Sequence, residues 1–171
     1  MNSNQLPVNE YAGFFATYIK AVENVNLIEE LEISVHDFIR FVQNIPMDKF
    51  DYRYAEGKWT IKEIIQHLID AERIFGYRAL RISRNDKTPL PGFEENDYVK
   101  NTDAKLRSIQ DLLTEMAVVR QSTLSLFKSF SQEQLSRMGV ASNNEISVRA
   151  IGFIIIGHQK HHQQIFQERY L

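Results

Sequence analysis

The sequence predicts an all-α protein, a four-helix bundle in up-down order with a short helical or loop extension at the N-terminus. Residues that break regular backbone are rare, with 7 glycines and 4 prolines among 171 residues. Residues 47–88 and 92–171 contain no proline, whereas a many-stranded sandwich or barrel needs Gly/Pro-rich turns roughly every 8–12 residues. Four segments repeat apolar residues at spacings of three and four, the pattern of helices with one buried face. We expect residues 1–171 to form a single domain.

Composition and charge exclude several classes of protein. The chain has no cysteine, which rules out a disulfide framework and any thiolate of its own. Twenty basic and 22 acidic residues give a net charge of −2, so no basic field would attract nucleic acid or an anionic membrane. The longest apolar run, residues 150–157, is far shorter than the about 20 residues of a spanning helix. The polar N-terminus does not resemble a signal peptide. We expect a soluble, cytoplasmic protein that binds neither nucleic acid nor membranes.

The first half of the chain contains two of the expected helices. The aromatic-rich residues 9–22 fit a short helix or a loop packed on the body. From Asn26 the pattern is helical, and Pro46 ends this first helix. The second helix begins with a capping box, in which the Thr60 hydroxyl and the Glu63 carboxylate satisfy free backbone donors at the helix start. It runs to about residue 84, where SRNDKTPLPGF indicates a loop.

The second half contains the other two helices. The third covers about 103–130, with an apolar face that includes Leu106. After a polar turn around residues 139–144, Ser147 caps a last helix that runs almost to the C-terminus. No segment shows the alternation of a strand. Three glycines lie inside expected helices, each at a cost of about 1 kcal/mol relative to alanine, so we expect close packing beside each, and room for a metal beside Gly157. They are Gly76, Gly152 and Gly157.

The histidines are the most informative residues for function. His158 and His162 lie one turn apart at the centre of the buried face of the last helix, and His67 lies on the apolar face of the second helix. Two imidazoles at i and i+4 can bind one metal ion, and a third ligand from a facing helix would leave open positions, as in catalytic sites. Hydrogen-bonded core histidines explain the same spacing, so the pattern leaves both interpretations open. We interpret His36 as a surface residue and His161 as a residue at the rim of the site.

Two stretches of the sequence resemble a known family. GKWTIKEIIQHLIDAERIFGYRALRISRNDKTPLPGF (57–93) and GHQKHHQQI (157–165) are similar to the DinB/YfiT-like superfamily of four-helix metalloenzymes. Members typically begin one helix with Trp-Ser/Thr-x-x-Glu, followed by His-Leu and an acidic residue, and carry a histidine pair on the last helix. The resemblance covers the chain from about Tyr54 to the end. It implies that His67, His158 and His162 bind a divalent metal, and that Asp70 orients a ligand from outside, although a solvated Asp70 fits the pattern equally well.

The resemblance favours an enzyme and leaves alternatives open. It implies Zn²⁺ or Ni²⁺ and a thiol-dependent S-transferase that uses a low-molecular-weight thiol, such as mycothiol or bacillithiol, to attack a small electrophile. Hydrolysis of a small amide or ester is the alternative with the same metal, and a non-catalytic, metal-stabilised stress-response module is the third hypothesis. Arg78 is either a binding residue for an anionic small-molecule substrate or part of a solvated face. A homodimer through the aromatic residues Phe14, Phe15 and Tyr18 is possible, and core packing explains them equally well.

Overall fold

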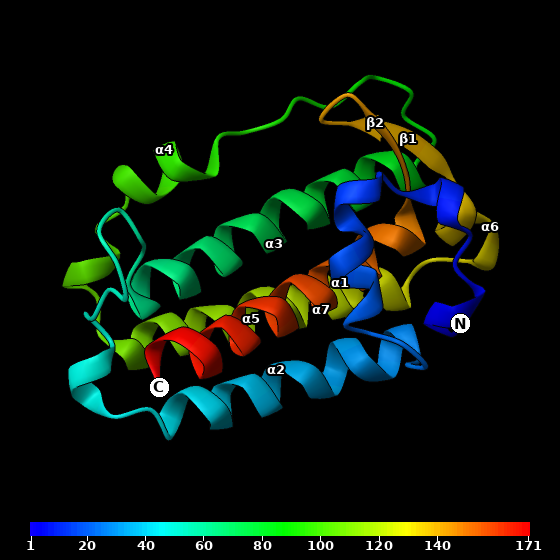
Figure 1. Ribbon diagram of the computed structural model, residues 1–171. Coiled ribbons are helices and arrows are strands. Elements are labelled where there is room, and N and C mark those ends of the chain that lie inside the picture. The colour runs from blue at the N-terminus through cyan, green and yellow to red at the C-terminus, as the bar shows by residue number, and fades with distance from the viewer.

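Four long helices form the body of the protein in the computed structural model, which describes residues 1–171 (Figure 1). They are α2 (Leu27–Gln43), α3 (Ile61–Ser83), α5 (Ile109–Lys128) and α7 (Val148–Ile165). The helix α3 packs against α5 and α7, and α2 packs against the same two helices from the other side. This arrangement confirms the predicted four-helix bundle. None of the helices combines the length and the apolar character needed to cross a bilayer.

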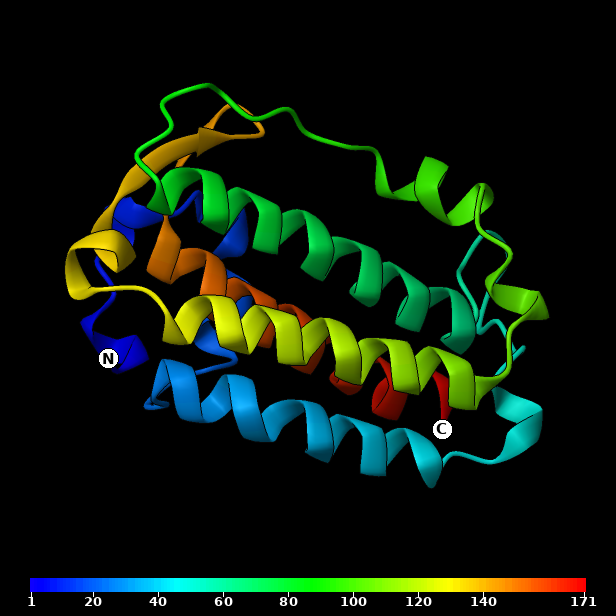
Figure 2. The same cartoon turned by 180° about the vertical axis from the view of Figure 1, so that it is seen from behind.

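The directions of the helices differ from the predicted up-down order. Helices α3 and α5 run in one direction, whereas α2 and α7 run in the other (Figures 1 and 2). The cause is the connection of residues 84–108, which contains the short helix α4 (Glu95–Lys100) and returns along the bundle to the end where α3 begins. A long crossover of this kind allows two consecutive helices to be parallel neighbours.

Local capping signals set the helix ends that were predicted best. The Thr60 hydroxyl accepts a hydrogen bond from the Glu63 amide at 3.2 Å, and the Glu63 carboxylate accepts one from the Thr60 amide at 2.7 Å. The Ser147 hydroxyl accepts a hydrogen bond from the Ala150 amide at 3.0 Å at the start of α7. Both predicted N-caps are confirmed, because the donors that they satisfy belong to the same turn of chain.

The predicted start of the third helix was wrong. Helix α5 begins at Ile109, because Ser108 caps it by accepting a hydrogen bond from the Asp111 amide at 3.0 Å. Residues Ala104–Leu106 form a separate 3₁₀ turn before it. Leu106, expected on the buried face, is 76% exposed as a result.

A small hairpin was also missed. Strands β1 (Met138–Ala141) and β2 (Asn144–Ser147) pair antiparallel after the short helix α6 (Gln132–Ser136). Ser142 and Asn143 form the turn with φ of 50° and 62°, the left-handed conformation of tight hairpin turns. Each strand has four residues, which is too short for alternation to be recognised in the sequence.

The N-terminal extension consists of short turns and a helix that lies on the bundle. Three 3₁₀ turns (Ser3–Gln5, Val8–Glu10 and Gly13–Phe15) precede α1 (Ala16–Lys20), which packs along α7. Phe15 and Tyr18 pack against the core, whereas Phe14 is 62% exposed. Core packing therefore accounts for Phe15 and Tyr18, two of the three aromatic residues of the possible dimer surface.

The glycines in the helices have different environments. A Cβ at Gly157 would lie 2.0 Å from the backbone oxygen of Tyr18, and a Cβ at Gly152 would lie 2.7 Å from the ring of Phe127. Close packing is confirmed at these two positions. At Gly157 the neighbour is α1, so the expectation of room for a metal there was wrong. Nothing lies within 4 Å of a Cβ at Gly76, so the packing expected there was also wrong.

The buried apolar residues form two clusters with a polar layer between them. One cluster contains Leu27, Leu31, Phe75 and Phe127, and the other contains Phe38, Ile65, Leu112 and Phe166. Each bundle helix has a buried polar residue at or near the point where its sequence passes from one cluster to the other. These residues are Ser34 on α2, Glu72 on α3, Arg120 on α5 and Gln159 on α7.

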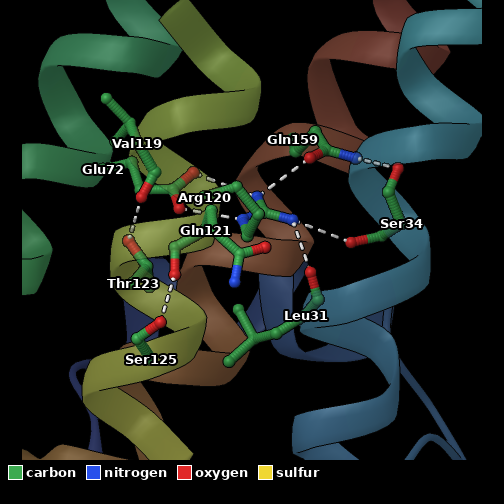
Figure 3. A network of polar contacts seen from close by, with 9 residues as sticks. All are labelled: Leu31, Ser34, Glu72, Val119, Arg120, Gln121, Thr123, Ser125 and Gln159. Atoms are coloured by element: carbon green, nitrogen blue, oxygen red, sulfur yellow. Dashed lines mark hydrogen bonds and ion pairs between the residues drawn. The ribbon is translucent and has the colours of Figure 1, made fainter.

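Arg120 is the centre of this polar layer (Figure 3). Its guanidinium donates two hydrogen bonds to the Glu72 carboxylate, at 2.8 and 3.0 Å. The three other N–H groups donate to the Gln159 side-chain oxygen at 2.9 Å, the Ser34 hydroxyl at 2.9 Å and the Leu31 carbonyl at 3.4 Å. All five donors of a buried guanidinium are thereby satisfied by partners on the three other helices.

Candidate metal centre

Three of the five histidines meet where α3 and α7 pack against each other. His67 lies in the second turn of α3, and His158 and His162 lie one turn apart on α7. The Nε2 atom of His158 lies 3.0 Å from the Nε2 of His67 and 3.1 Å from the Nε2 of His162. One ring nitrogen from each residue lies within 4.8 Å of the other two. All three side chains are buried.

The chemistry of these contacts fits a cation better than a hydrogen-bond network. A neutral ring nitrogen offers either one N–H or one lone pair, yet the Nε2 of His158 faces two other ring nitrogens at hydrogen-bond distance. It cannot form a full hydrogen bond with both. An ion bound at 2.0–2.1 Å in a tetrahedral site separates its nitrogen ligands by about 3.3 Å, close to the two short distances.

Burial keeps the three imidazoles in the form that binds a metal. Burial lowers the pKa of His67 to about 4. Burial, followed by the charges of the neighbouring histidines, lowers the pKa of His158 and His162 well below 6.5. All three rings are therefore neutral near neutral pH, with lone pairs free to bind a metal.

Two aromatic side chains flank the histidines. The Trp59 ring lies 5.0 Å from the His67 ring, and the Tyr18 ring lies 5.1 Å from the His158 ring, measured between centroids. The Nδ1 atom of His162 is buried and has no hydrogen-bond partner in the protein. Orientation of the His162 ring therefore depends on packing and not on a hydrogen bond at its second ring nitrogen.

Comparison with protein families places the chain. The model of the DinB superfamily matches residues 30–166, most of the chain and all three histidines. The protein belongs to the DinB superfamily. This finding confirms the resemblance carried by the capping box and the histidines.

Relatives of this DinB-superfamily protein are named for metal-dependent hydrolysis. A protein of Oceanobacillus iheyensis, named "Putative metal-dependent hydrolase", is 23% identical over 137 residues, which cover 79% of this chain and 78% of the relative. A protein of Bacillus cereus strain AH820 with the same description is 19% identical over 167 residues, which cover 95% and 92%. The solved structure of YfiT from Bacillus subtilis matches with a TM-score of 0.74 at 17% identity, covering 95% of this chain and 90% of YfiT. YfiT is described as a probable metal-dependent hydrolase with an unusual four-helix bundle topology.

Asp70, predicted to orient a ligand, makes its contacts elsewhere. Its carboxylate accepts a hydrogen bond from the Gln66 side chain at 2.9 Å, and Gln66 in turn accepts one from Arg107 at 2.7 Å. Burial raises the pKa of Asp70, although Gln66 and Arg73 oppose this shift. No hydrogen bond joins Asp70 to the three histidines, and its role in the outer shell stays a prediction.

His161 and Arg78 differ in their relation to the centre. The His161 ring is half-buried and lies 5.3 Å from the Tyr18 ring and 5.4 Å from the His162 ring, at the edge of the cluster. Arg78 is buried and donates hydrogen bonds to the Pro91 carbonyl and the Ser142 hydroxyl, both at 2.9 Å. These bonds attach the 84–108 connection to the hairpin. A role for Arg78 in substrate binding stays a prediction.

Sequence reasoning missed two features of the site. Tyr18 was considered only for a dimer or for core packing, and the structure places its ring against His158 and His161. The Arg120 layer was not recognised, although Gln159 directly follows His158 and Glu72 lies five residues beyond His67. Arg120 and Glu72 lie next to the apolar faces of their helices in the sequence. Because charged residues are rarely buried without partners, this position could have indicated that the two side chains pair.

Proposed function

We propose that this protein is a metal-dependent hydrolase of a small amide or ester, with a divalent ion, Zn²⁺ or Ni²⁺, held by His67, His158 and His162. The observation that carries the proposal is the convergence of three neutral, buried imidazoles, with Nε2 atoms 3.0 and 3.1 Å apart. Three imidazoles suit both metals. The names of the relatives support hydrolysis as the reaction.

The side chains around the centre have separable tasks in this proposal. The three histidines supply neutral nitrogen ligands, and the cluster contains no fourth protein ligand, so coordination positions would be left for water or substrate. A bound divalent ion supplies Lewis acidity and activates water near neutral pH. Trp59 and Tyr18 supply aromatic contacts that position the rings of His67 and His158.

Thiol-dependent S-transfer is the second function that the same centre could serve. Because the chain has no cysteine, the thiol would have to be a co-substrate of low molecular weight. We rank it second because the names of the relatives refer to hydrolases. The substrate is a small molecule in both cases.

Metal content tests the centre directly. Protein purified without added metal should contain close to one equivalent of a transition metal by mass spectrometry, and His67→Ala, His158→Ala and His162→Ala should each lose most of it. His36→Ala is the matched control, because His36 is an exposed histidine on α2. Less than about a tenth of an equivalent in the wild type, also after incubation with Zn²⁺ or Ni²⁺, would falsify the proposal.

Activity with and without thiol separates the two reactions. Turnover of a panel of p-nitrophenyl esters and anilides without any thiol supports hydrolysis, whereas turnover only with bacillithiol or mycothiol and an electrophile such as monobromobimane supports S-transfer. The third hypothesis, a metal that only stabilises the bundle, predicts metal binding without either reaction. It also predicts a large loss of thermal stability on chelation. We expect a modest loss, because two apolar clusters hold the helices.

The remaining expectations about partners and location stay proposals. The net charge of −2 favours a protein that does not bind nucleic acid. A homodimer is testable by light scattering, and cytoplasmic location by fractionation of the cells that produce the protein.

A further inference from the structure

Tyr18, a residue of the N-terminal extension, lies beside the histidine cluster. Its ring lies 5.1 Å from the His158 ring and 5.3 Å from the His161 ring. The ring is partly buried against the core. Its hydroxyl has a different environment, because it forms no hydrogen bond within the protein and is not among the buried polar atoms that lack a partner. The phenol donor therefore has no hydrogen-bond partner within the protein, although its ring lies beside the rings of His158 and His161.

The position of Tyr18 is fixed by backbone packing. The backbone oxygen of Tyr18 occupies the place where a Cβ of residue 157 would be, 2.0 Å from the ideal position of that atom. Only glycine permits this approach of α1 to α7, one residue before His158. Phe15 adds ring contacts at 6.2 Å to Tyr18 and at 6.2 Å to Phe75 of α3. The N-terminal extension is thus held against both helices that carry the histidines, with α1 on α7 and the turn before it, which contains Phe15, against α3.

The interior side of the centre is closed, so a ligand must approach from the outer side. The space behind His158, among Leu68, Glu72, Phe75 and Met116, has no room for a water molecule. Beyond it lies the Arg120 layer, whose donors are all satisfied. A ligand would therefore reach the three histidines from the side away from the Arg120 layer, and α1 packs along α7 next to His158.

We propose that the Tyr18 hydroxyl donates a hydrogen bond to an oxygen of the ligand bound at the three-histidine centre, and so binds the carbonyl group of the substrate. Such a donor stabilises negative charge that develops on a carbonyl oxygen. The proposal rests on the metal centre of the proposed function and adds a substrate-binding residue to it. It also gives a role to the extension, which lies outside the matched residues 30–166.

The test measures ligand binding apart from turnover. The protein is loaded with Co²⁺, and acetohydroxamate, a small ligand with a carbonyl oxygen, is titrated while the visible absorption of the cobalt is recorded. Tyr18→Phe keeps the ring and removes the hydroxyl. We expect the Kd for acetohydroxamate to rise about tenfold, as for the loss of one hydrogen bond to a charged group, with cobalt stoichiometry and Tm unchanged. Tyr77→Phe is the matched control, because Tyr77 is an exposed tyrosine ten residues beyond His67 on α3.

Each outcome of this experiment decides a stated point. Wild-type affinity for acetohydroxamate in Tyr18→Phe overturns the proposal. Loss of cobalt in Tyr18→Phe also overturns it, because the residue would then support the metal centre structurally. If the wild type binds no cobalt, the proposed function and this proposal both fail. If the wild type binds acetohydroxamate through the hydroxyl but hydrolyses no ester or anilide, only the proposed reaction fails and the role of Tyr18 stands.

Discussion

Replacement of Arg120 by methionine should destabilise the protein more than any surface change of the same kind. Methionine keeps much of the length of the side chain but removes all five N–H donors. The Glu72 carboxylate, whose side chain is 5% exposed, would lose the ion pair that compensates its burial. Ser34, Gln159 and the Leu31 carbonyl would each lose a donor as well.

The expected size follows from the cost of an isolated buried charge. Removal of one member of a buried ion pair typically costs about 3–5 kcal/mol. For a domain of this size, each kcal/mol lowers Tm by about 2–4 °C, so Arg120→Met should lower Tm by roughly 10 °C. The double variant Glu72→Leu/Arg120→Met removes both charges, and it should be more stable than Arg120→Met alone, because no uncompensated carboxylate remains.

Urea unfolding of the metal-free protein measures these differences without a contribution from bound metal. Arg73→Met is the matched control, since Arg73 pairs with Glu115 at 2.6 Å but its side chain is 50% exposed, and an exposed pair contributes about 0–1 kcal/mol. A loss below about 1 kcal/mol in Arg120→Met would refute the reasoning. The reasoning would also be refuted if the loss of unfolding free energy in Glu72→Leu/Arg120→Met equalled the sum of the losses in Glu72→Leu and Arg120→Met.

Three further predictions follow from packing, capping and charge. In thermal unfolding, Gly157→Ala should lower stability by about 1–3 kcal/mol, because the added Cβ would meet the backbone of α1. Gly76→Ala should raise stability by up to about 1 kcal/mol, because nothing lies near the added Cβ. Equal effects of the two substitutions would contradict the packing argument. Thr60→Ala should cost about 1 kcal/mol in urea unfolding, and no loss would show that the cap contributes nothing. Burial raises the pKa of Glu10, but the hydrogen bonds of its carboxylate with Arg149 and Ser147 and the charge of Arg149 together outweigh burial and hold the pKa below its usual value of 4.5. The carboxylate therefore contributes stability above pH 4.5 that is lost as pH falls, and stability curves at about pH 5 to 3 should be flatter for Glu10→Gln than for the wild type.

Local signals explain which parts of the fold could be predicted. The helix starts at Thr60 and Ser147 were correct, because a cap and the donors that it satisfies lie within four residues. The start of α5 was misplaced because residues 103–107 are compatible with a helix, and only the Ser108 cap separates the 3₁₀ turn from it. The parallel direction of α3 and α5 depends on the path of the 84–108 connection, which no local pattern records.

The sequence by itself determined that the protein is helical, and that His158 and His162 share one face of the last helix, because both follow from a period of 3.6 residues. Only the tertiary structure decided that His67 reaches them across the contact of α3 with α7. The packing of α1 on Gly157 placed Tyr18 beside the centre, and the meeting of four helices allowed Arg120 to be buried. The residues in these contacts are 39 to 139 positions apart in the chain, from Arg120 and Gln159 to Tyr18 and Gly157. Their geometry depends on how whole helices pack, which the period of a single helix does not specify.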